Sequence, residues 1–267
     1  MRVRDVRAMF QNRRHRAERY CTPEYWDSKA VEFSDASVSM WPNNHLNAHY
    51  DRERVGWLER YLGDVSGLRM LDAGCGFGRL SKYYAERGAQ VVGVDFSTRS
   101  IELARGMCPG DNPTFRVQSL FELDEQNRYD IVIVWGVVTI ACRSREELLD
   151  VTTRLRRSLV PGGRLLMMEP VHSGFLHRVL KLGIDEFAAT LRRAGFTIHD
   201  ITHLHFWPAR LALAYFPLPR LLTDFGYYVG DALLHALRRR ALGDYKAIFA
   251  TVPGNNGPVR PGTEARV

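Results

Sequence analysis

The residues with the clearest chemical signature are three glycines and two aspartates between positions 70 and 97. Asp72 precedes the alternating Gly74, Gly76 and Gly78, and Asp95 follows seventeen residues after the last of them. Glycines let a ligand approach the backbone, and a helix that begins directly after them offers free N–H groups to an anion. An acid at the end of the next strand can accept hydrogen bonds from ribose hydroxyls. The segment therefore predicts a nucleoside site.

A dinucleotide-binding enzyme is the nearest alternative, because its fingerprint is also a glycine run between a strand and a helix, with the spacing GxGxxG. Here the third glycine, Gly78, comes one position early, and Arg79 follows it. The spacing is GxGxG, with Asp72 in front of it. A nicotinamide-dependent oxidoreductase therefore stays open as the less favoured hypothesis.

Short apolar runs alternate with amphipathic segments on both sides of this loop, which indicates a doubly wound, Rossmann-like α/β sheet with helices on both faces. Asp130–Trp135 is a continuous β-branched run, as in a strand covered on both faces. Seven strands are expected, at 69–73, 90–95, 114–118, 130–135, 164–169, 196–202 and 245–251. Helices are expected at 51–61, 80–86, 97–107, 144–159, 184–193 and 229–240, with 161–163 (Pro-Gly-Gly) ending the fourth of these.

The acid-GxGxG arrangement resembles the first motif of the class I S-adenosylmethionine (SAM)-dependent methyltransferases. The resemblance continues through Val92–Ser97, Tyr129-Asp130, Leu159–Gly163 and Ala194–Phe196. It covers roughly 55–203 and 243–252, and it implies a mostly parallel seven-stranded sheet whose last strand is antiparallel. The flanking Tyr25-Trp26-Asp27 and Leu46-Asn47 are similar to the ubiquinone-biosynthesis type of small-molecule O-methyltransferase.

The resemblance implies SAM as the cofactor, and it implies a role for each residue that matches the family's motifs. Asp72 would lie near the methionine amine, Asp95 would hold the ribose hydroxyls and Phe96 would flank the adenine. Ser119 stands where the family often has Asp, so the adenine contact departs from the pattern there. The cofactor-binding set is Asp72, Gly74, Cys75, Gly76, Gly78, Asp95, Phe96, Ser97, Ser119, Leu120 and Trp135.

A methyl acceptor that is a phenol or alcohol is helped by a general base. Glu169 and His172 follow the end of an expected strand, where open α/β sheets place their ligands. His45 and His49 are four residues apart and can share one helical face, but no third ligand is spaced for a metal, so no metal is expected. The candidates are His45, His49, Tyr50, Glu169 and His172.

Three segments are expected: a basic arm at 1–20, a helical cap at 21–63, and the SAM-binding domain at 64–267 with an apolar, partly helical insertion at 205–244. The arm carries +5 of the formal net charge of +7, which argues against a nucleic-acid surface on the rest. Four cysteines without paired spacing, and an N-terminus without an apolar signal segment, favour a cytoplasmic protein.

Together these features predict methyl transfer from SAM to a small, apolar or aromatic metabolite, with O-methylation favoured and N- or C-methylation open. The insertion would cover the acceptor, and peripheral membrane contact through it stays open, although no stretch is long enough to span a bilayer. A protein that binds SAM without transferring its methyl group, such as a cyclase-like enzyme or a regulatory subunit, is the alternative. The oligomeric state and the acceptor are left undetermined.

Overall fold

The computed structural model describes residues 16–32, 43–174, 176–237 and 242–254, and its centre is a seven-stranded sheet. The strand order is β3-β2-β1-β4-β5-β7-β6. Strands β1 to β5 pair in parallel, and β7 runs antiparallel to both of its neighbours, β5 and β6. The predicted fold class is confirmed. The strands are β1 (Arg69–Ala73), β2 (Gln90–Asp95), β3 (Thr114–Val117), β4 (Tyr129–Trp135), β5 (Leu159–Glu169), β6 (Thr197–Phe206) and β7 (Gly243–Thr251).

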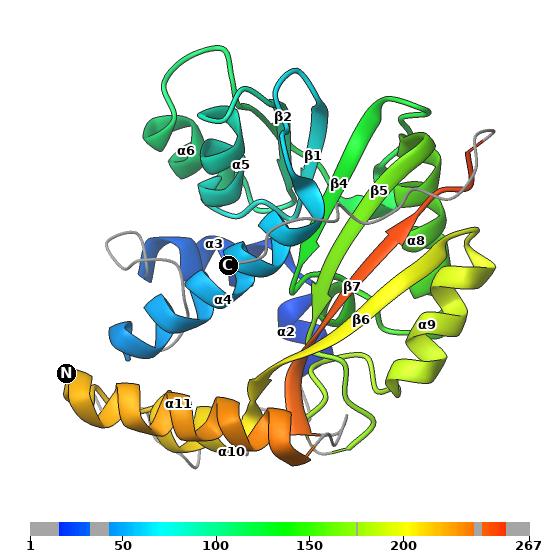
Figure 1. The fold of residues 1–267 in the computed structure, drawn as a ribbon. Coiled ribbons are helices and arrows are strands. Elements are labelled where there is room, and N and C mark those ends of the chain that lie inside the picture. The colour runs from blue at the N-terminus through cyan, green and yellow to red at the C-terminus, as the bar shows by residue number, and fades with distance from the viewer. Residues whose placement is uncertain (1–15, 33–42, 175, 238–241, 255–267) are drawn as a thin grey trace.

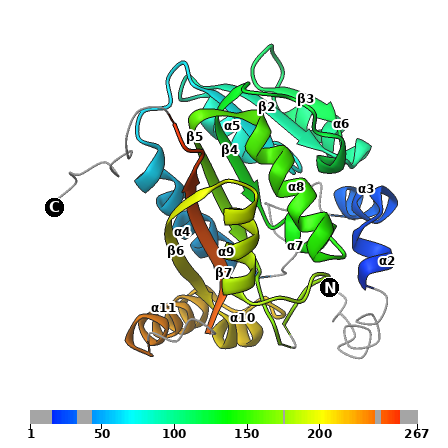
Figure 2. The same cartoon turned by 90° about the vertical axis from the view of Figure 1, so that its right-hand side faces the viewer.

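Helices cover both faces of the sheet (Figure 1 and Figure 2). Alternate residues of β4 divide between the two cores, as the pleat of a strand requires. Ile131 and Ile133 pack with α4 (Asn44–Leu62) and α5 (Arg79–Ala85), whereas Val132 and Val134 pack with α8 (Arg145–Ser158) and α9 (Ile184–Arg193). Burial on both faces explains why β4 reads as an uninterrupted apolar run.

Three shorter elements complete the carboxyl edge of the sheet. Helix α6 (Thr98–Met107) follows β2 and packs on β3 through Ile101, Ala104 and Phe115. The 3₁₀ turn η1 (Leu120–Glu122) follows β3, and the single-turn helix α7 (Val138–Ala141) follows β4. Each begins where a parallel strand ends, so all three border the region where this class of fold binds ligands.

The turn at 161–163 lies inside β5, so the expectation that it separates a helix from the strand was wrong. Helix α8 ends at Ser158, and β5 starts at Leu159. Gly162 N donates to Val252 O, and Val252 N donates to Gly163 O, so the turn is paired with the end of β7. Gly162 has a φ of +80°, a conformation that favours glycine.

In the described part of the chain before α4, two helices lie across the carboxyl edge. They are α2 (Arg16–Tyr20) and α3 (Pro23–Glu32). The Cys21 thiol contacts Ile140 O and Ala141 O in α7, and the indole of Trp26 donates to Tyr20 O. The expected helical cap thus contains α3 and α4 in its described part. The division into arm, cap and domain stays a prediction, and most of the basic arm (residues 1–15) lies outside the described residues.

The insertion between β6 and β7 forms two helices at the lower end of the molecule in Figure 1. They are α10 (Trp207–Leu213) and α11 (Arg220–Leu237). Helix α11 starts nine residues before the predicted position, and the predicted end at Arg240 lies outside the described residues. Both helices pack on β6, and α11 also packs on α4. Among the described residues, no helix combines the length and the apolarity needed to cross a bilayer.

Candidate functional site

The loop between β1 and α5 is held against β2 by backbone hydrogen bonds. Gly74 N and Cys75 N both donate to Val94 O, at 2.8 and 2.9 Å, and Gly78 N donates to Cys75 O. The three glycines of the loop have φ values of +80°, +52° and +74°, which side chains rarely adopt. The sequence GxGxG is therefore required by the backbone path of this loop.

The glycines of the loop face different surroundings. A Cβ atom on Gly74 would lie 2.3 Å from Cγ2 of Val137, and one on Gly78 would lie 2.5 Å from the Phe115 ring. A Cβ atom on Gly76 would meet nothing within 4 Å. Gly74 and Gly78 are thus glycines because protein packs against them, whereas Gly76 borders open space. Ligand approach at these glycines stays a prediction, and the open space beside Gly76 is compatible with it.

Asp95 stands at the carboxyl end of β2 with its carboxylate fixed by two backbone donors. Gly76 N donates to Oδ2 at 3.0 Å, and Ser97 N donates to Oδ1 at 2.9 Å. Burial raises the pKa of this carboxyl, against the lowering effect of those hydrogen bonds. Each carboxylate oxygen can accept more than one hydrogen bond. The geometry therefore leaves Asp95 oriented beside Gly76 with acceptor capacity for hydroxyl groups.

Asp72 is buried at the middle of the same edge, with a relative exposure of 4%. The Ser81 hydroxyl donates to its Oδ2 at 2.7 Å. Burial raises its pKa from 3.8 to about 6, and the nearby charge of Asp95 adds to the rise. A buried carboxylate near a second one is stabilised by a bound cation. The pair of Asp72 and Asp95 therefore makes an electronegative site that suits a positively charged ligand.

Helix α3 is tied to the edge of this site through Asp27. The Ser97 hydroxyl donates to Asp27 Oδ1 at 2.6 Å, and Arg99 N donates to the same oxygen at 3.0 Å. The Ser97 oxygen also accepts from Ser100 N as the N-cap of α6. Ser97 was predicted to bind cofactor, and its fully buried hydroxyl is instead engaged in joining α3 to α6. Its contribution to the site is its backbone N–H, which orients Asp95.

The residues predicted to border adenine lie at the ends of β2 and β3. Phe96 is partly buried directly after Asp95. Ser119 is the N-cap of η1 and accepts from Phe121 N at 3.3 Å. The Leu120 side chain is packed in the core, so only its backbone faces the edge. Gln118 N donates to Asp95 O and fixes this turn beside β2.

The Cys75 thiol, also in the predicted set, lies within the loop and contacts the carbonyl of Gly76. Burial raises the pKa of this thiol well above its usual value. A Cβ atom on Gly93 would lie 3.0 Å from its sulfur, so the thiol fills space above β2. The environment indicates a packing role for an unreactive thiol.

Trp135 ends β4 beneath a cation from α4. The guanidinium carbon of Arg54 lies 4.2 Å from the centre of the Trp135 ring and 5.7 Å from that of Tyr245. Asp51, one turn earlier on α4, accepts from Arg79 at the start of α5 at 2.9 Å. These contacts place one face of α4 over the glycine loop and the end of β4.

Glu169 was a candidate general base, and the structure gives it another role. It is fully buried and accepts hydrogen bonds from Val137 N, Val138 N, Thr139 N and the Thr139 hydroxyl, at 2.7 to 3.1 Å. These donors satisfy both oxygens. Glu169 therefore anchors the loop after β4, the loop whose Val137 packs against Gly74.

His45 and His49 do not form a pair. His45 is exposed, whereas the His49 ring is buried between α4 and α11. Its Nε2 lies 2.6 Å from Asp224 Oδ1, and its ring stacks on Tyr227 with 4.2 Å between centres. These contacts join two helices. Among the described residues, no group of three or more His, Cys, Asp or Glu side chains is arranged to hold a metal ion.

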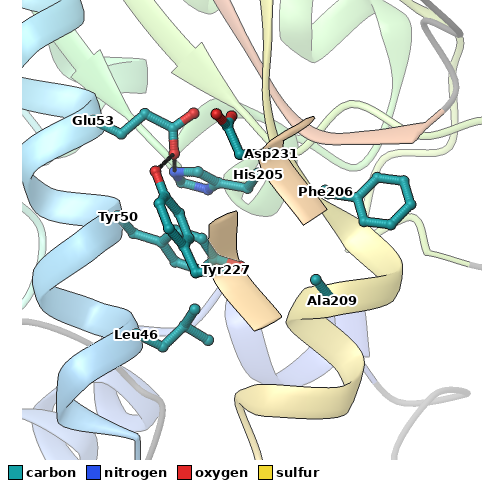
Figure 3. Close-up of a pocket in the computed structure, with 8 residues that line it drawn as sticks. All are labelled: Leu46, Tyr50, Glu53, His205, Phe206, Ala209, Tyr227 and Asp231. Atoms are coloured by element: carbon teal, nitrogen blue, oxygen red, sulfur yellow. Dashed lines mark hydrogen bonds and ion pairs between the residues drawn. The ribbon is translucent and has the colours of Figure 1, made fainter. Parts of the chain in front are cut away.

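A small cavity of about 10 Å³ lies between α4, β6, α10 and α11. Figure 3 shows the residues that line it. Tyr50 stacks on His205 with 3.9 Å between ring centres, and the Tyr227 hydroxyl donates to Glu53 at 3.1 Å. Glu53 also lies 3.5 Å from Nε2 of His205. Burial raises the pKa of Glu53 to about 7 and lowers that of His205. Burial likewise raises the pKa of Tyr50, so this predicted base is held as a neutral phenol.

His172 lies after β5 and is oriented by Asp244 at the start of β7. Its Nε2 is 3.1 Å from Asp244 Oδ1, and Arg210 Nε is 2.7 Å from the other oxygen of that carboxylate. Burial alone would raise the pKa of Asp244, but Arg210 and His172 hold it below its usual value. The carboxylate of Asp244 therefore orients the His172 ring through Nε2. Of the predicted bases, His172 therefore has the most suitable environment.

Comparison with known proteins agrees with this geometry. A family model described as a methyltransferase domain matches residues 70–163, from β1 to the turn within β5. The ubiquinone biosynthesis O-methyltransferase of Bordetella parapertussis (strain 12822) is 40% identical over 113 residues. The match covers 41% of this chain and 45% of that protein, so the chain matches less than half of that relative's length.

Residues 70–163 of the chain are thus similar to methyltransferase domains. Among solved structures, the magnesium protoporphyrin IX methyltransferase of Synechocystis PCC 6803, which has SAH bound, has a TM-score of 0.57 at 20% identity. That comparison covers 93% of this chain and 100% of the other. The [4+2]-cyclase SpnF has a TM-score of 0.62 at 19% identity, covering 87% and 96%. At such identities the structures show a shared fold.

Several residues of the candidate site were missed from the sequence. Asp27 and Arg54 come from the segment before the glycine loop, where no motif assigns roles to single positions. Asp244 and Arg210 come from opposite ends of the insertion and meet only in the folded chain. His205 has a φ of +60°, which nothing in the sequence indicates. Of these residues, Asp27 could have been noticed from the sequence, because it belongs to the Tyr25-Trp26-Asp27 run.

Proposed function

We propose that this protein transfers the methyl group of SAM to a small, apolar or aromatic acceptor. The observation that carries the proposal is the pair of carboxylates on either side of the glycine loop, the buried Asp72 and the partly buried Asp95. SAM is a cation with an ammonium group and a ribose diol, and these are the two groups that such carboxylates recognise. The match of residues 70–163 to a methyltransferase domain supports the same cofactor.

Residues of the glycine loop and of the carboxyl edge of the sheet can be matched to each chemical group of SAM. Asp72 would pair with the methionine amine, and the carboxylate of Asp95 would accept from the ribose hydroxyls. The open space beside Gly76 supports close approach of SAM to the protein backbone at that point. Phe96 and the turn at Ser119 and Leu120 would border the adenine, and the end of β4 at Trp135 would border the methionine.

SAM supplies an electrophilic methyl group on a sulfonium. The acceptor oxygen forms a bond to that carbon while the carbon–sulfur bond breaks, the electron pair passes to sulfur, and the acceptor loses its proton to a base. The protein's part is to align the acceptor and exclude water. O-methylation is favoured because the relatives in ubiquinone biosynthesis are O-methyltransferases, with N- and C-methylation left as variants.

Two groups on the acceptor side are suited to take the proton. His172 is oriented by Asp244 through Nε2, and Glu53 has a pKa near 7, close to the pH at which a base works best. Arg54, next to Glu53 in the chain, lies over the rings of Trp135 and Tyr245. The aromatic rings on this side support an acceptor with an apolar or aromatic body.

The segment 205–244 is proposed to cover this acceptor region. Its α10 supplies Arg210, and its α11 supplies Tyr227, so the insertion completes the polar groups around α4. A cytoplasmic location and the absence of a nucleic-acid partner remain predictions from the sequence.

A coupled assay for S-adenosylhomocysteine release, run over a panel of phenolic, hydroxy and amino acceptors, tests the activity. We expect release with at least one apolar or aromatic acceptor, and a loss of at least about 100-fold after His172→Asn or Glu53→Gln, whichever is the base. SAM binding without release across all acceptors would instead favour a SAM-binding protein that does not transfer methyl groups.

A further inference from the structure

Helix α11 exposes a continuous apolar face to solvent. Leu221 has a relative exposure of 82% and Phe225 of 70%. Further large apolar side chains of the same helix are exposed by 42 to 58%: Leu222, Tyr228, Val229, Leu233 and Leu237. From the usual accessible areas of such side chains, the face presents roughly 800 Å² of apolar surface, more than the largest patch on a typical monomer. A face of this size marks an interaction site.

The exposed face is separate from the side that anchors the helix. Thr223, Gly230 and Leu234 are buried on the opposite side. A Cβ atom on Gly230 would lie 2.7 Å from Cβ of Ala209, so that side packs tightly on α10. Figure 1 and Figure 2 both place α11 at the lower extremity of the molecule. A large partner can therefore reach the exposed face without approaching the sheet.

The exposed face is bulky at one end and shallow at the other. Successive helical residues turn by about 100°, so positions 221, 225, 232 and 236 fall within about 60° of one another around the axis of α11. The first two are Leu221 and Phe225, which have large side chains. The last two are Ala232 and Ala236, which are also exposed. A face with this gradient complements a copy of itself that runs in the opposite direction, because each bulky end then meets a shallow one.

We propose that this face binds the same face of a second copy of the chain, with the two α11 helices antiparallel about a twofold axis between positions 228 and 229. Phe225 then faces Ala232 of the partner subunit, and Leu221 faces Ala236 of the partner subunit. The small alanine side chains let the two helix axes approach closely. The available apolar area also matches the roughly 800 Å² per partner that a stable interface buries. This dimer does not depend on the proposed methyl transfer.

The charges beside the face favour a second copy over a strongly charged partner. Asp224 lies 3.4 Å from Arg220 and 2.6 Å from His49. Asp231 lies 3.4 Å from His235, so each acid of α11 has a basic neighbour within its own chain. A second copy brings an equally apolar face with an equally paired margin, so the interface leaves no charge buried without a partner.

Sedimentation velocity of the full-length protein, at concentrations from about 0.5 to about 50 μM, tests the proposal. The double variant Leu221→Asp/Phe225→Asp would place acids against the apolar face of the partner. Met107→Asp, at an exposed apolar position at the end of α6, is the matched control. We expect wild type and the control to form dimers, and the double variant to associate at least about 100-fold more weakly.

Oxidative cross-linking tests the antiparallel pairing. Val229 stands beside the twofold axis, so the two sulfurs of the variant Val229→Cys can meet. The two copies of position 237 would lie about 25 Å apart along the helices, which makes Leu237→Cys the matched control. Wild type gives the background from the native cysteines. With copper phenanthroline as the oxidant, we expect a covalent dimer for Val229→Cys well above the level in wild type and in Leu237→Cys.

Circular dichroism of each variant keeps the test decisive. The substituted side chains are exposed, so the helical signal should be unchanged; if the double variant misfolds, Leu221→Ser/Phe225→Ser replaces it, and the cross-linking does not depend on either. A wild-type monomer over the whole concentration range would overturn the proposal, whatever else the face binds. A dimer that the double variant leaves intact, or a cross-link at Leu237→Cys as strong as that at Val229→Cys, would overturn it as well.

Discussion

Replacing Asp72 by Asn should make the ligand-free protein more stable while weakening SAM binding. Burial raises the pKa of Asp72 from 3.8 to about 6, and each pKa unit corresponds to about 1.4 kcal/mol. The ionised carboxylate therefore costs the folded state about 3 kcal/mol at neutral pH. Asn keeps the shape and can still accept from Ser81, but its amide needs acceptors of its own. We expect a net gain of about 1–3 kcal/mol, or several degrees in Tm.

The pH dependence of stability gives the direction of this effect. Because the folded state holds the Asp72 proton up to about pH 6 and the unfolded state releases it near 3.8, wild type loses stability as pH rises through that interval. The advantage of Asp72→Asn should therefore be full at pH 8 and vanish below about pH 4. Thermal melts at both pH values measure it.

The same variant should bind SAM at least about 30-fold more weakly, because it removes the charge that pairs with the ligand's amine. Wild-type affinity should likewise fall below about pH 6, where Asp72 becomes protonated. Asp130→Asn is the matched control: Asp130 lies at the opposite end of β4, and the hydrogen bond from Arg69 holds its pKa below the usual range. It should leave SAM affinity unchanged and slightly lower stability. A destabilised Asp72→Asn, or one with unchanged SAM affinity, would refute the reasoning.

Three further substitutions test other parts of the structure. Gly74→Ala should lower the free energy of unfolding by about 2–4 kcal/mol in denaturant titrations, because the new Cβ would meet Val137 at 2.3 Å and φ is +80°. Asp27→Ala should weaken SAM binding several-fold by calorimetry and raise hydrogen exchange in α3, because Ser97 loses the partner that ties α3 to α6. Glu53→Gln should match wild type in melting temperature at pH 4 and exceed it at pH 8, because burial raises the pKa of Glu53 from 4.5 to about 7 and wild type loses stability as pH rises through that interval. Equal curves at pH 8 would contradict this.

The sheet could be predicted from the sequence because its signals are local. The apolar run of β4, the alternation of strand and helix, and the glycine loop each lie within a few consecutive residues. Strands β1 and β2 were located at their exact bounds. The strand start at Leu159 was missed because it depends on pairings with distant residues: Leu159 pairs with Tyr129, and the turn that follows pairs with Val252, about ninety residues away in the chain.

The cofactor side of the site could be predicted for a similar reason, since Asp72, Gly76 and Asp95 occupy fixed places at strand ends. The acceptor side could not. His172 contacts Asp244, which is far from it in the chain, and Glu53 accepts a hydrogen bond from Tyr227 of another helix. The carboxylate oxygens of Glu169 accept hydrogen bonds from the backbone of the loop after β4. Nothing in the sequence separates a buried glutamate that anchors a loop from one that accepts a proton.

Isothermal titration of the protein with SAM tests the central claim most directly. Wild type should bind one SAM per chain, S-adenosylhomocysteine should compete for the same site, and Asp95→Ala, confirmed as folded by its melting curve, should bind at least about 30-fold more weakly. Absence of SAM binding to wild type, or undiminished binding by Asp95→Ala, would contradict the assignment of the glycine loop and Asp95 as the cofactor site.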